Sequence, residues 1–199
     1  MIVVGISGAS GPIMGIRLIE ELLLSGEAVL AVVTPAARQI IGHEILDPDT
    51  PYTGLADILR QRGRAADRDG LREYDHRDFF APMASGSAEF EAVVVVPCSM
   101  KTLAAVAGGF ADTLVTRACD VALKERRRCV LVPRETPLNL IHLKNMSRAA
   151  HAGAEILPPV PGFYTRPQSV DDVVDFIVGK ILSLLGRKHS LFKEWGTES

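Results

Sequence analysis

The chain has 199 residues, a length typical of one domain with a full hydrophobic core. Hydrophobic residues make up 47% and charged residues 23%, a balance that excludes a largely disordered protein. The net charge of −2 disfavours a general nucleic-acid-binding surface, because such surfaces need an excess of basic residues.

Targeting and metal-binding signals are missing from the sequence. No apolar run reaches the roughly 18 to 20 residues needed to cross a bilayer, and no basic leader is visible, so we expect a cytoplasmic protein without a membrane span. The three cysteines form no CxxC pair, which favours reduced thiols. His43-Glu44 resembles the start of an HExxH motif, but position 47 is Asp, so we expect no metal.

Strands and helices alternate from the start of the chain. Apolar runs at residues 2–6 and 28–33 predict two buried strands. Apolar residues recur at helical spacing from Ile13 to Leu23, and Ser25-Gly26 ends that pattern. The second strand is closed by Thr34-Pro35, and a helix is expected over residues 36–45.

The same alternation continues in the second half. Further strands are predicted at residues 92–96, 130–132 and 155–157, and helices at residues 113–127 and 170–185. Thr136-Pro137 resembles an N-cap followed by a proline in the first helical turn, so another helix is expected from there to about Ala152. Residues 47–83 have no clear period and are expected to be a surface excursion with one short helix at 55–62.

This order predicts an α/β fold, with a doubly wound, mostly parallel sheet covered by helices on both faces. We expect one domain over residues 1–186 and a separate polar tail over residues 187–199. Ligands of such sheets bind beyond the carboxyl ends of the strands. The residues that follow each strand are therefore the first candidates for a site.

A glycine-rich turn, Gly5 to Gly11, follows the first strand and opens a helix. Glycines allow backbone amides to approach an anion, and a helix N-terminus adds a partial positive charge. The spacing is not GxGxxG, a P-loop or a GxSxG elbow. The turn therefore indicates either a phosphate or nucleotide site or a tight structural turn.

Two further strand ends carry polar residues. Ser99 to Thr102 follow the third clear strand and suit either a phosphate or flavin edge, or a serine-capped helix start with a solvated lysine. Arg134-Glu135 follow the fourth and suit either anion binding with proton transfer or a surface ion pair.

Other candidates lie on helices and loops. Arg117 and Lys124 are seven residues apart and share a helix face. Residues 126–128 are all arginine. We interpret them as solvent-exposed side chains at the C-terminal end of a helix, where the helix dipole favours positive charge. Glu44 suits a cap as well as a chemical role, and Phe163-Tyr164 offer an aromatic wall or plain packing. Alone, these residues indicate an α/β protein that binds a phosphorylated or nucleotide-like ligand, without naming a reaction.

Five segments in register resemble one family, the UbiX flavin prenyltransferases. They are GISGASG (5–11), PCSMKTL (97–103), RACDVALKERR (117–127), VPRETP (132–137) and PGFYTRPQ (161–168). The resemblance implies a Rossmann-like fold, bound FMN and a dodecamer built of trimers. It implies a metal-independent transfer of a dimethylallyl group from dimethylallyl phosphate to N5 and C6 of reduced FMN. The prenylated FMN would serve UbiD-type decarboxylases.

The resemblance also assigns residues by position. One set of residues would bind FMN, with Ser10 near N5. In this set, Thr34 keeps a hydroxyl at the position where the family usually has Ser-Lys. The FMN set is Gly8, Ala9, Ser10, Thr34, Ser99, Met100, Lys101, Thr102 and Arg134. The substrate set is Ser85, Gly86, Arg117, Lys124, Tyr164, Lys180 and Trp195, with Arg134 also near the phosphate. Trp195 would bring the tail over the site or a subunit interface.

Glu135, Ser10 and Glu44 are the implied catalytic residues, with Glu135 protonating the leaving phosphate. Two other functions stay open at this point. One is an FMN-dependent decarboxylase of peptidyl cysteine, although its usual early His and Asn-rich motif are missing. The other is a non-catalytic FMN carrier, which would have no use for the second cationic set of Arg117, Lys124 and Lys180.

Overall fold

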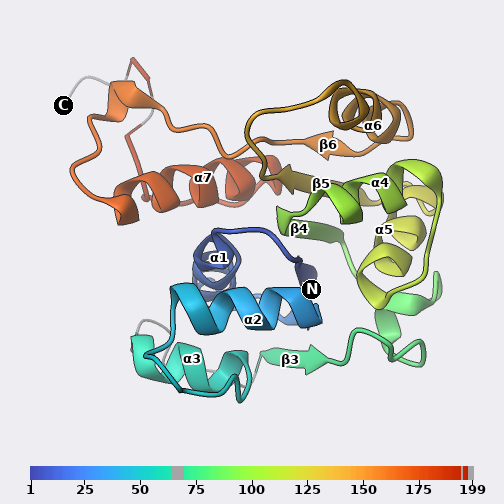
Figure 1. Ribbon diagram of the computed structural model, residues 1–199, viewed down its shortest axis with the longest axis horizontal. Coiled ribbons are helices and arrows are strands. Elements are labelled where there is room, and N and C mark those ends of the chain that lie inside the picture. Colours follow the sequence, from blue (N-terminus) through green and yellow to red (C-terminus); the bar gives the residue numbers. More distant parts are fainter. Residues whose placement is uncertain (64–69, 194, 197–199) are drawn as a thin grey trace.

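A computed structural model describes residues 1–63, 70–193 and 195–196 of the chain. A single six-stranded parallel sheet runs through it in the order β3-β2-β1-β4-β5-β6. Figure 1 shows β3 at the lower edge and β6 at the upper edge of the molecule. The strands are β1 (Ile2–Ile6), β2 (Val29–Val33), β3 (Leu71–Tyr74), β4 (Ala92–Cys98), β5 (Arg128–Pro133) and β6 (Glu155–Ile156).

Helices connect the strands and cover both faces. They are α1 (Pro12–Leu24), α2 (Pro35–Glu44), α3 (Leu55–Arg62), α4 (Met100–Gly108), α5 (Leu114–Lys124), α6 (Leu140–His151) and α7 (Val170–Leu184), with short 3₁₀ turns η1 (Pro82–Ala84) and η2 (Phe163–Thr165). Side chains of successive strand residues point to opposite faces. Ile2, Val4 and Ile6 therefore pack with α1, α2, α3 and α7, whereas Val3 packs with η1, α4, α5 and α6.

The predicted doubly wound α/β class is confirmed. Strands β1, β2 and β4 are buried along their whole length, as expected for apolar runs covered on both sides. The strand order reverses between β1 and β4, because the chain first winds outward to β3 and then returns to the other side of β1. This reversal is the switch point at which doubly wound sheets bind ligands.

Three expectations about elements were wrong. Helix α6 begins at Leu140 rather than at Thr136-Pro137, because the Asn139 side chain accepts a hydrogen bond of 2.9 Å from His142 N and caps the helix there. Helix α5 ends at Lys124, and Arg126 adopts the left-handed conformation directly after it. The described part of the 47–83 excursion contains not only α3 but also strand β3, which pairs with β2.

Candidate functional site

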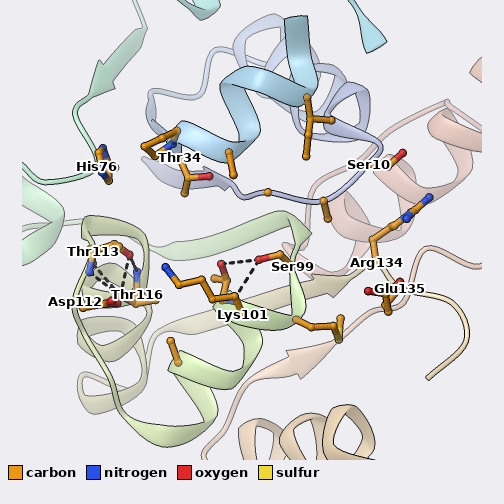
Figure 2. Close-up of a pocket in the computed structure, with 18 of the residues that line it drawn as sticks. Ser10, Thr34, His76, Ser99, Lys101, Asp112, Thr113, Thr116, Arg134 and Glu135 are labelled. Atoms are coloured by element: carbon orange, nitrogen blue, oxygen red, sulfur yellow. Dashed lines mark hydrogen bonds between the residues drawn. The ribbon is translucent and has the colours of Figure 1, made fainter. Parts of the chain in front are cut away.

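A cavity of about 810 Å³ opens at the switch point, beyond the carboxyl ends of β1 and β4. Its volume falls in the range typical of small-molecule and cofactor sites. Figure 2 shows side chains from several elements converging on it. The lining comprises Gly8, Ala9, Ser10, Thr34, Pro35, Ala36, Ile40, His76, Arg77, Ser99, Met100, Lys101, Thr102, Ala105, Asp112, Thr113, Thr116, Arg134 and Glu135.

The glycine-rich turn lies tightly against the start of α2. A Cβ atom added at Gly8 would lie 2.6 Å from the Cβ of Ala36, so only glycine permits this approach. Gly11 has a φ of 91° and forms the N-cap of α1 without a capping side chain of its own. Glu44, at the end of α2, supplies that cap by accepting a 2.9 Å hydrogen bond from Gly11 N.

A buried hydroxyl joins the two strand ends that flank the switch point. Ser7 Oγ donates to the carbonyl of Pro97 at 2.9 Å and accepts from Ser99 N at 2.8 Å. Ser99 in turn caps α4, since its Oγ accepts a hydrogen bond from Thr102 N at 3.3 Å. The helix-cap alternative for Ser99 is therefore confirmed, and the residue also lies in the cavity wall.

The cavity suits an anionic ligand. Residues at or close to the N-termini of α1, α2, α4 and α5 line its wall, and each N-terminus carries a partial positive charge. The lining also holds three cations, Arg77, Lys101 and Arg134, against two carboxylates, Asp112 and Glu135, which leaves a positive balance. The close approach at Gly8, the size and this electrostatic character together fit a nucleotide-like cofactor such as FMN.

Polar side chains gather at two ends of the cavity in Figure 2. Ser10, Arg134 and Glu135 lie at one end, and His76 lies with the start of α5 at the other, with Lys101 between them. Glu135 is exposed, and its carboxylate accepts a 3.0 Å hydrogen bond from Thr136 N. An exposed carboxyl next to a guanidinium can exchange protons with a ligand held at this end.

The cavity brings together every residue that the sequence assigned to FMN, from three strand ends and the start of α2. Glu44 lies outside the described lining, one hydrogen bond away from the turn that carries Ser10. Thr34 caps α2, with its hydroxyl accepting from Ala37 N at 3.3 Å, and also faces the cavity. The predicted cofactor set is therefore a spatial cluster, and its contacts with FMN stay a prediction.

The predicted substrate set does not line this cavity in the described part of the chain, and one group of it lies along α5. The Arg117 guanidinium donates to the carbonyl of Ala84 at 2.9 Å and pairs with Asp120 at 2.6 Å. Lys124 pairs with Glu125, and this hydrogen bond is the main cause of the lowered pKa of Glu125. A Cβ atom added at Gly86 would lie 2.7 Å from Lys124 Nζ, so the loop that contains Gly86 is in contact with the Lys124 side chain.

A second group lies at the C-terminal end. The rings of Tyr164 and Trp195 meet edge to face, with centroids 5.2 Å apart, and both line a separate cavity of about 460 Å³. Lys180 is an exposed residue in the C-terminal third of α7. Within one chain, the predicted substrate residues therefore form separate clusters rather than one ring around the cavity.

Sequence reasoning missed several residues at one end of the cavity: His76, Arg77, Asp112, Thr113 and Thr116. The first two follow β3, an edge strand with half-exposed side chains that gives a weak signal. Thr113 and Thr116 form a capping box at the start of α5, and this pattern could have marked the position. The interpretation of residues 126–128 as solvated was wrong for Arg127, which donates to two backbone carbonyls.

The three cysteines are buried free thiols in the core, as expected. Burial raises the pKa of Cys98, and a hydrogen bond with Cys129 together with burial raises the pKa of Cys119. The thiols of Cys98 and Cys119 are therefore protonated at neutral pH and are poor nucleophiles. Across residues 1–63, 70–193 and 195–196, no three His, Cys, Asp or Glu side chains are grouped to hold a metal ion. None of the helices in this described part is long and apolar enough to cross a membrane.

Comparison with known proteins places these features in a family. A family model named Flavoprotein matches residues 1–182. The flavin prenyltransferase UbiX of Methanocaldococcus jannaschii is 45% identical, over 98% of this chain and 98% of that protein. The flavin prenyltransferase UbiX of Pseudomonas aeruginosa is 43% identical, over 99% and 94% of the two chains.

Solved structures agree with the sequence relatives. The crystal structure of AnUbiX (PadA1) in complex with FMN and dimethylallyl pyrophosphate has a TM-score of 0.86 and 39% identity, covering 100% of this chain and 98% of the other. A dodecameric, FMN-dependent UbiX-like decarboxylase from Escherichia coli O157:H7 has a TM-score of 0.85 and 37% identity, covering 98% of both chains. Since the similarity extends over nearly the whole length in sequence and in fold, this chain belongs to the UbiX family of flavin prenyltransferases.

Proposed function

We propose that the protein transfers a dimethylallyl group from dimethylallyl phosphate to N5 and C6 of reduced FMN. The observation that carries this proposal is the cavity at the switch point, where helix N-termini, Lys101 and Arg134 meet the glycine-rich turn. In this reaction the bond between the allylic carbon and the phosphate oxygen breaks as that carbon bonds to N5, and phosphate leaves with the electron pair. The bond to C6 would form at the far carbon of the alkene, which gains a proton at its other carbon while C6 loses one. The flavin supplies the nucleophilic atoms, so the protein needs no activated serine or cysteine.

The chain's own residues would hold the two ligands. The turn of Gly8 to Ser10, the hydroxyl of Thr34, and Ser99 to Thr102 would bind FMN, because they line the cavity at the helix starts. Arg134 would neutralise negative charge that develops on the leaving phosphate. Glu135 would protonate that phosphate. Glu44, which is hydrogen-bonded to the glycine-rich turn, would be a second residue for proton transfer.

The substrate residues that lie apart in one chain would meet through assembly of several copies. The dodecameric E. coli relative supports an oligomer, and Arg117, Lys124 and Lys180 would then bring cations from different copies to one phosphate. The tail with Trp195 would close over the site or a subunit interface, where its ring already contacts Tyr164. No metal is required in this scheme, because the cations replace it in stabilising the phosphate.

The product's use follows from the family. Prenylated FMN would serve a UbiD-type decarboxylase, and the buried free thiols favour a reducing compartment such as the cytoplasm. The two alternatives are less favoured. The solved peptidyl-cysteine decarboxylase EpiD is only 18% identical, so that likeness concerns the fold alone. A non-catalytic carrier would leave the second cationic set without a ligand.

The test is anaerobic incubation of the protein with reduced FMN and dimethylallyl phosphate, followed by mass spectrometry of the flavin. We expect the flavin mass to rise by one five-carbon prenyl unit. A parallel reaction with the diphosphate identifies the preferred donor. Flavin that binds without gaining mass from either donor would leave the two alternatives, the peptidyl-cysteine decarboxylase and the carrier, and absence of FMN binding in calorimetry would refute all three functions.

A further inference from the structure

Arg127 follows α5, and its side chain forms hydrogen bonds with a loop that is distant from it in the sequence. Two of its guanidinium nitrogens donate hydrogen bonds of 2.7 Å, one to the carbonyl of Gly86 and the other to that of Ala88. The same guanidinium lies over the ring of Phe90, 4.4 Å from its centroid. Hydrogen bonds from a charged donor and a cation–π contact thus hold one half-buried side chain in place.

The loop held in this way is the segment Ala84 to Ala88, which we call the serine loop. A second arginine, Arg117, donates to the carbonyl of Ala84 at 2.9 Å, so three alternate carbonyls of the loop accept bonds from arginines. The hydroxyls of Ser85 and Ser87 are 2.8 Å apart and hydrogen-bonded. The backbone of the serine loop is therefore fixed from one side.

Lys124 and Glu125 approach the same loop. A Cβ atom added at Gly86 would overlap Glu125 Oε1 and lie 2.7 Å from Lys124 Nζ, so the ion pair lies directly against the glycine. A shift of the loop backbone at Gly86 toward α5 would therefore push this ion pair aside. The loop that Arg127 holds thus bounds, on one side, the space open to Lys124, a residue we propose for the substrate phosphate.

We infer that Arg127 is a positioning residue, which fixes the serine loop and through it the Lys124 ammonium for binding of the allylic phosphate. This inference rests on the proposed prenyl transfer and deepens it. Arg127 itself touches neither ligand in this scheme. A guanidinium suits the task because its planar fork presents two parallel donors and can stack on an aromatic ring, whereas an ammonium cannot do both.

The test compares Arg127→Met and Arg127→Lys with Arg126→Met, a matched change of the exposed neighbouring arginine. For Arg127→Met we expect the KM for dimethylallyl phosphate to rise about tenfold or more, with kcat changed less, since hydrogen bonds from a charged group are lost. The FMN dissociation constant should stay the same, because the serine loop lies outside the described cavity lining. Arg127→Lys should give an intermediate KM, and Arg126→Met the wild-type value.

A second readout needs no ligand. Amide hydrogen exchange reports opening of residues 84–90, in which the N–H groups of Ser85, Ala88 and Phe90 donate to backbone carbonyls. Exchange in this segment should be faster in Arg127→Met and unchanged in Arg126→Met, with strands β1 and β2 protected equally in both. This measurement also shows that the variant is folded.

Several results would overturn the inference. They are an unchanged KM and unchanged exchange in Arg127→Met, an equal change in Arg126→Met, or full wild-type behaviour of Arg127→Lys. A weakened FMN affinity equal to the loss in KM would also do so, because it would indicate general damage. If the wild-type protein makes no prenylated flavin, the proposed function fails, whereas the exchange experiment still decides whether Arg127 holds the loop.

Discussion

Gly11 N donates a 2.9 Å hydrogen bond to the carboxylate of Glu44, which joins the start of α1 to the end of α2. The two helices are therefore fixed relative to each other at the turn that carries Ser10. Because Gly11 has no side chain with which to cap α1, the glutamate from another element performs this function. The proposed catalytic role of Glu44 can be separated from this structural one.

Replacing Glu44 tests both roles. Glu44→Ala removes the acceptor and should lower the free energy of unfolding by about 0.5–1 kcal/mol, as loss of an exposed N-cap does. Glu44→Gln keeps an amide oxygen in the same place and should be nearly as stable as the wild type. Urea denaturation measures both variants. Prenyl transfer that falls in Glu44→Gln at unchanged stability would support a proton-transfer role, and full activity would exclude it.

Gly8→Ala should weaken FMN binding. The added methyl would lie 2.6 Å from the Cβ of Ala36, so the turn and the start of α2 must move apart. Overpacking of this kind costs about 1–3 kcal/mol, which corresponds to roughly 5- to 150-fold in the dissociation constant if it falls on the binding conformation. Calorimetry with FMN provides the measurement. The control is Gly42→Ala, a change in α2 at a glycine with open space around it, and this variant should bind FMN normally.

Ser7→Ala should destabilise the switch point. The change leaves Ser99 N without its buried acceptor, at a cost of about 1–3 kcal/mol in the free energy of unfolding. Ser25→Ala removes an exposed hydroxyl whose acceptor, the Leu22 carbonyl, keeps a second hydrogen bond from Glu27 N, and it should cost less than about 0.5 kcal/mol. Chemical denaturation compares the two variants. Equal losses would contradict the structural role assigned to Ser7.

Glu135→Gln should separate binding from turnover. The amide keeps the size of the side chain but cannot protonate the leaving phosphate, so the rate should fall by about 10² to 10⁴. FMN affinity should be unchanged, because the carboxylate charge is not needed to hold the cofactor. Asp47→Asn, at an exposed position outside the described cavity lining, should behave as the wild type. Undiminished turnover in Glu135→Gln would remove this residue from the mechanism.

The buried thiols should make stability depend on alkaline pH. The pKa of Cys98 is raised by burial above its ordinary value of 9.0, so the thiol stays protonated in the folded state while it ionises in the unfolded state. Above about pH 9 the unfolded state therefore binds fewer protons, and the free energy of unfolding falls as pH rises. Cys98→Ala should reduce this slope by up to about 1.4 kcal/mol per pH unit. Denaturation at pH 8, 9 and 10 measures both slopes, and parallel curves would contradict the prediction.

The sequence predicted the sheet where burial leaves a simple pattern. Strands β2 and β4 are continuous apolar runs because both faces are covered, and such runs end at recognisable proline positions. Strand β3 was missed because its edge position leaves the side chains of Leu71 to Tyr74 half exposed, without a continuous run. The start of α6 was misplaced because two capping signals, Thr136 and Asn139, lie three residues apart and only the second one caps the helix.

The site was predictable where its residues follow strands directly. Ser10, Ser99 and Arg134 lie at the carboxyl ends of neighbouring strands, and the topology alone brings them together. Arg127 was not predictable in the same way. Its partners are backbone carbonyls some forty residues earlier, and a carbonyl acceptor leaves no signature in the side-chain sequence.

The layout also bears on how such a chain could diversify. The cofactor wall is formed by short turns that follow β1, β2, β4 and β5, whereas Tyr164, Lys180 and Trp195 all belong to the last forty residues. Under the proposed assignment, mutations in that last fifth of the chain would alter only the part of the donor site that these three residues form, while Arg117, Lys124 and the FMN-binding turns stay intact. Exchange of this terminal stretch between homologues is therefore a natural route to enzymes with new donors.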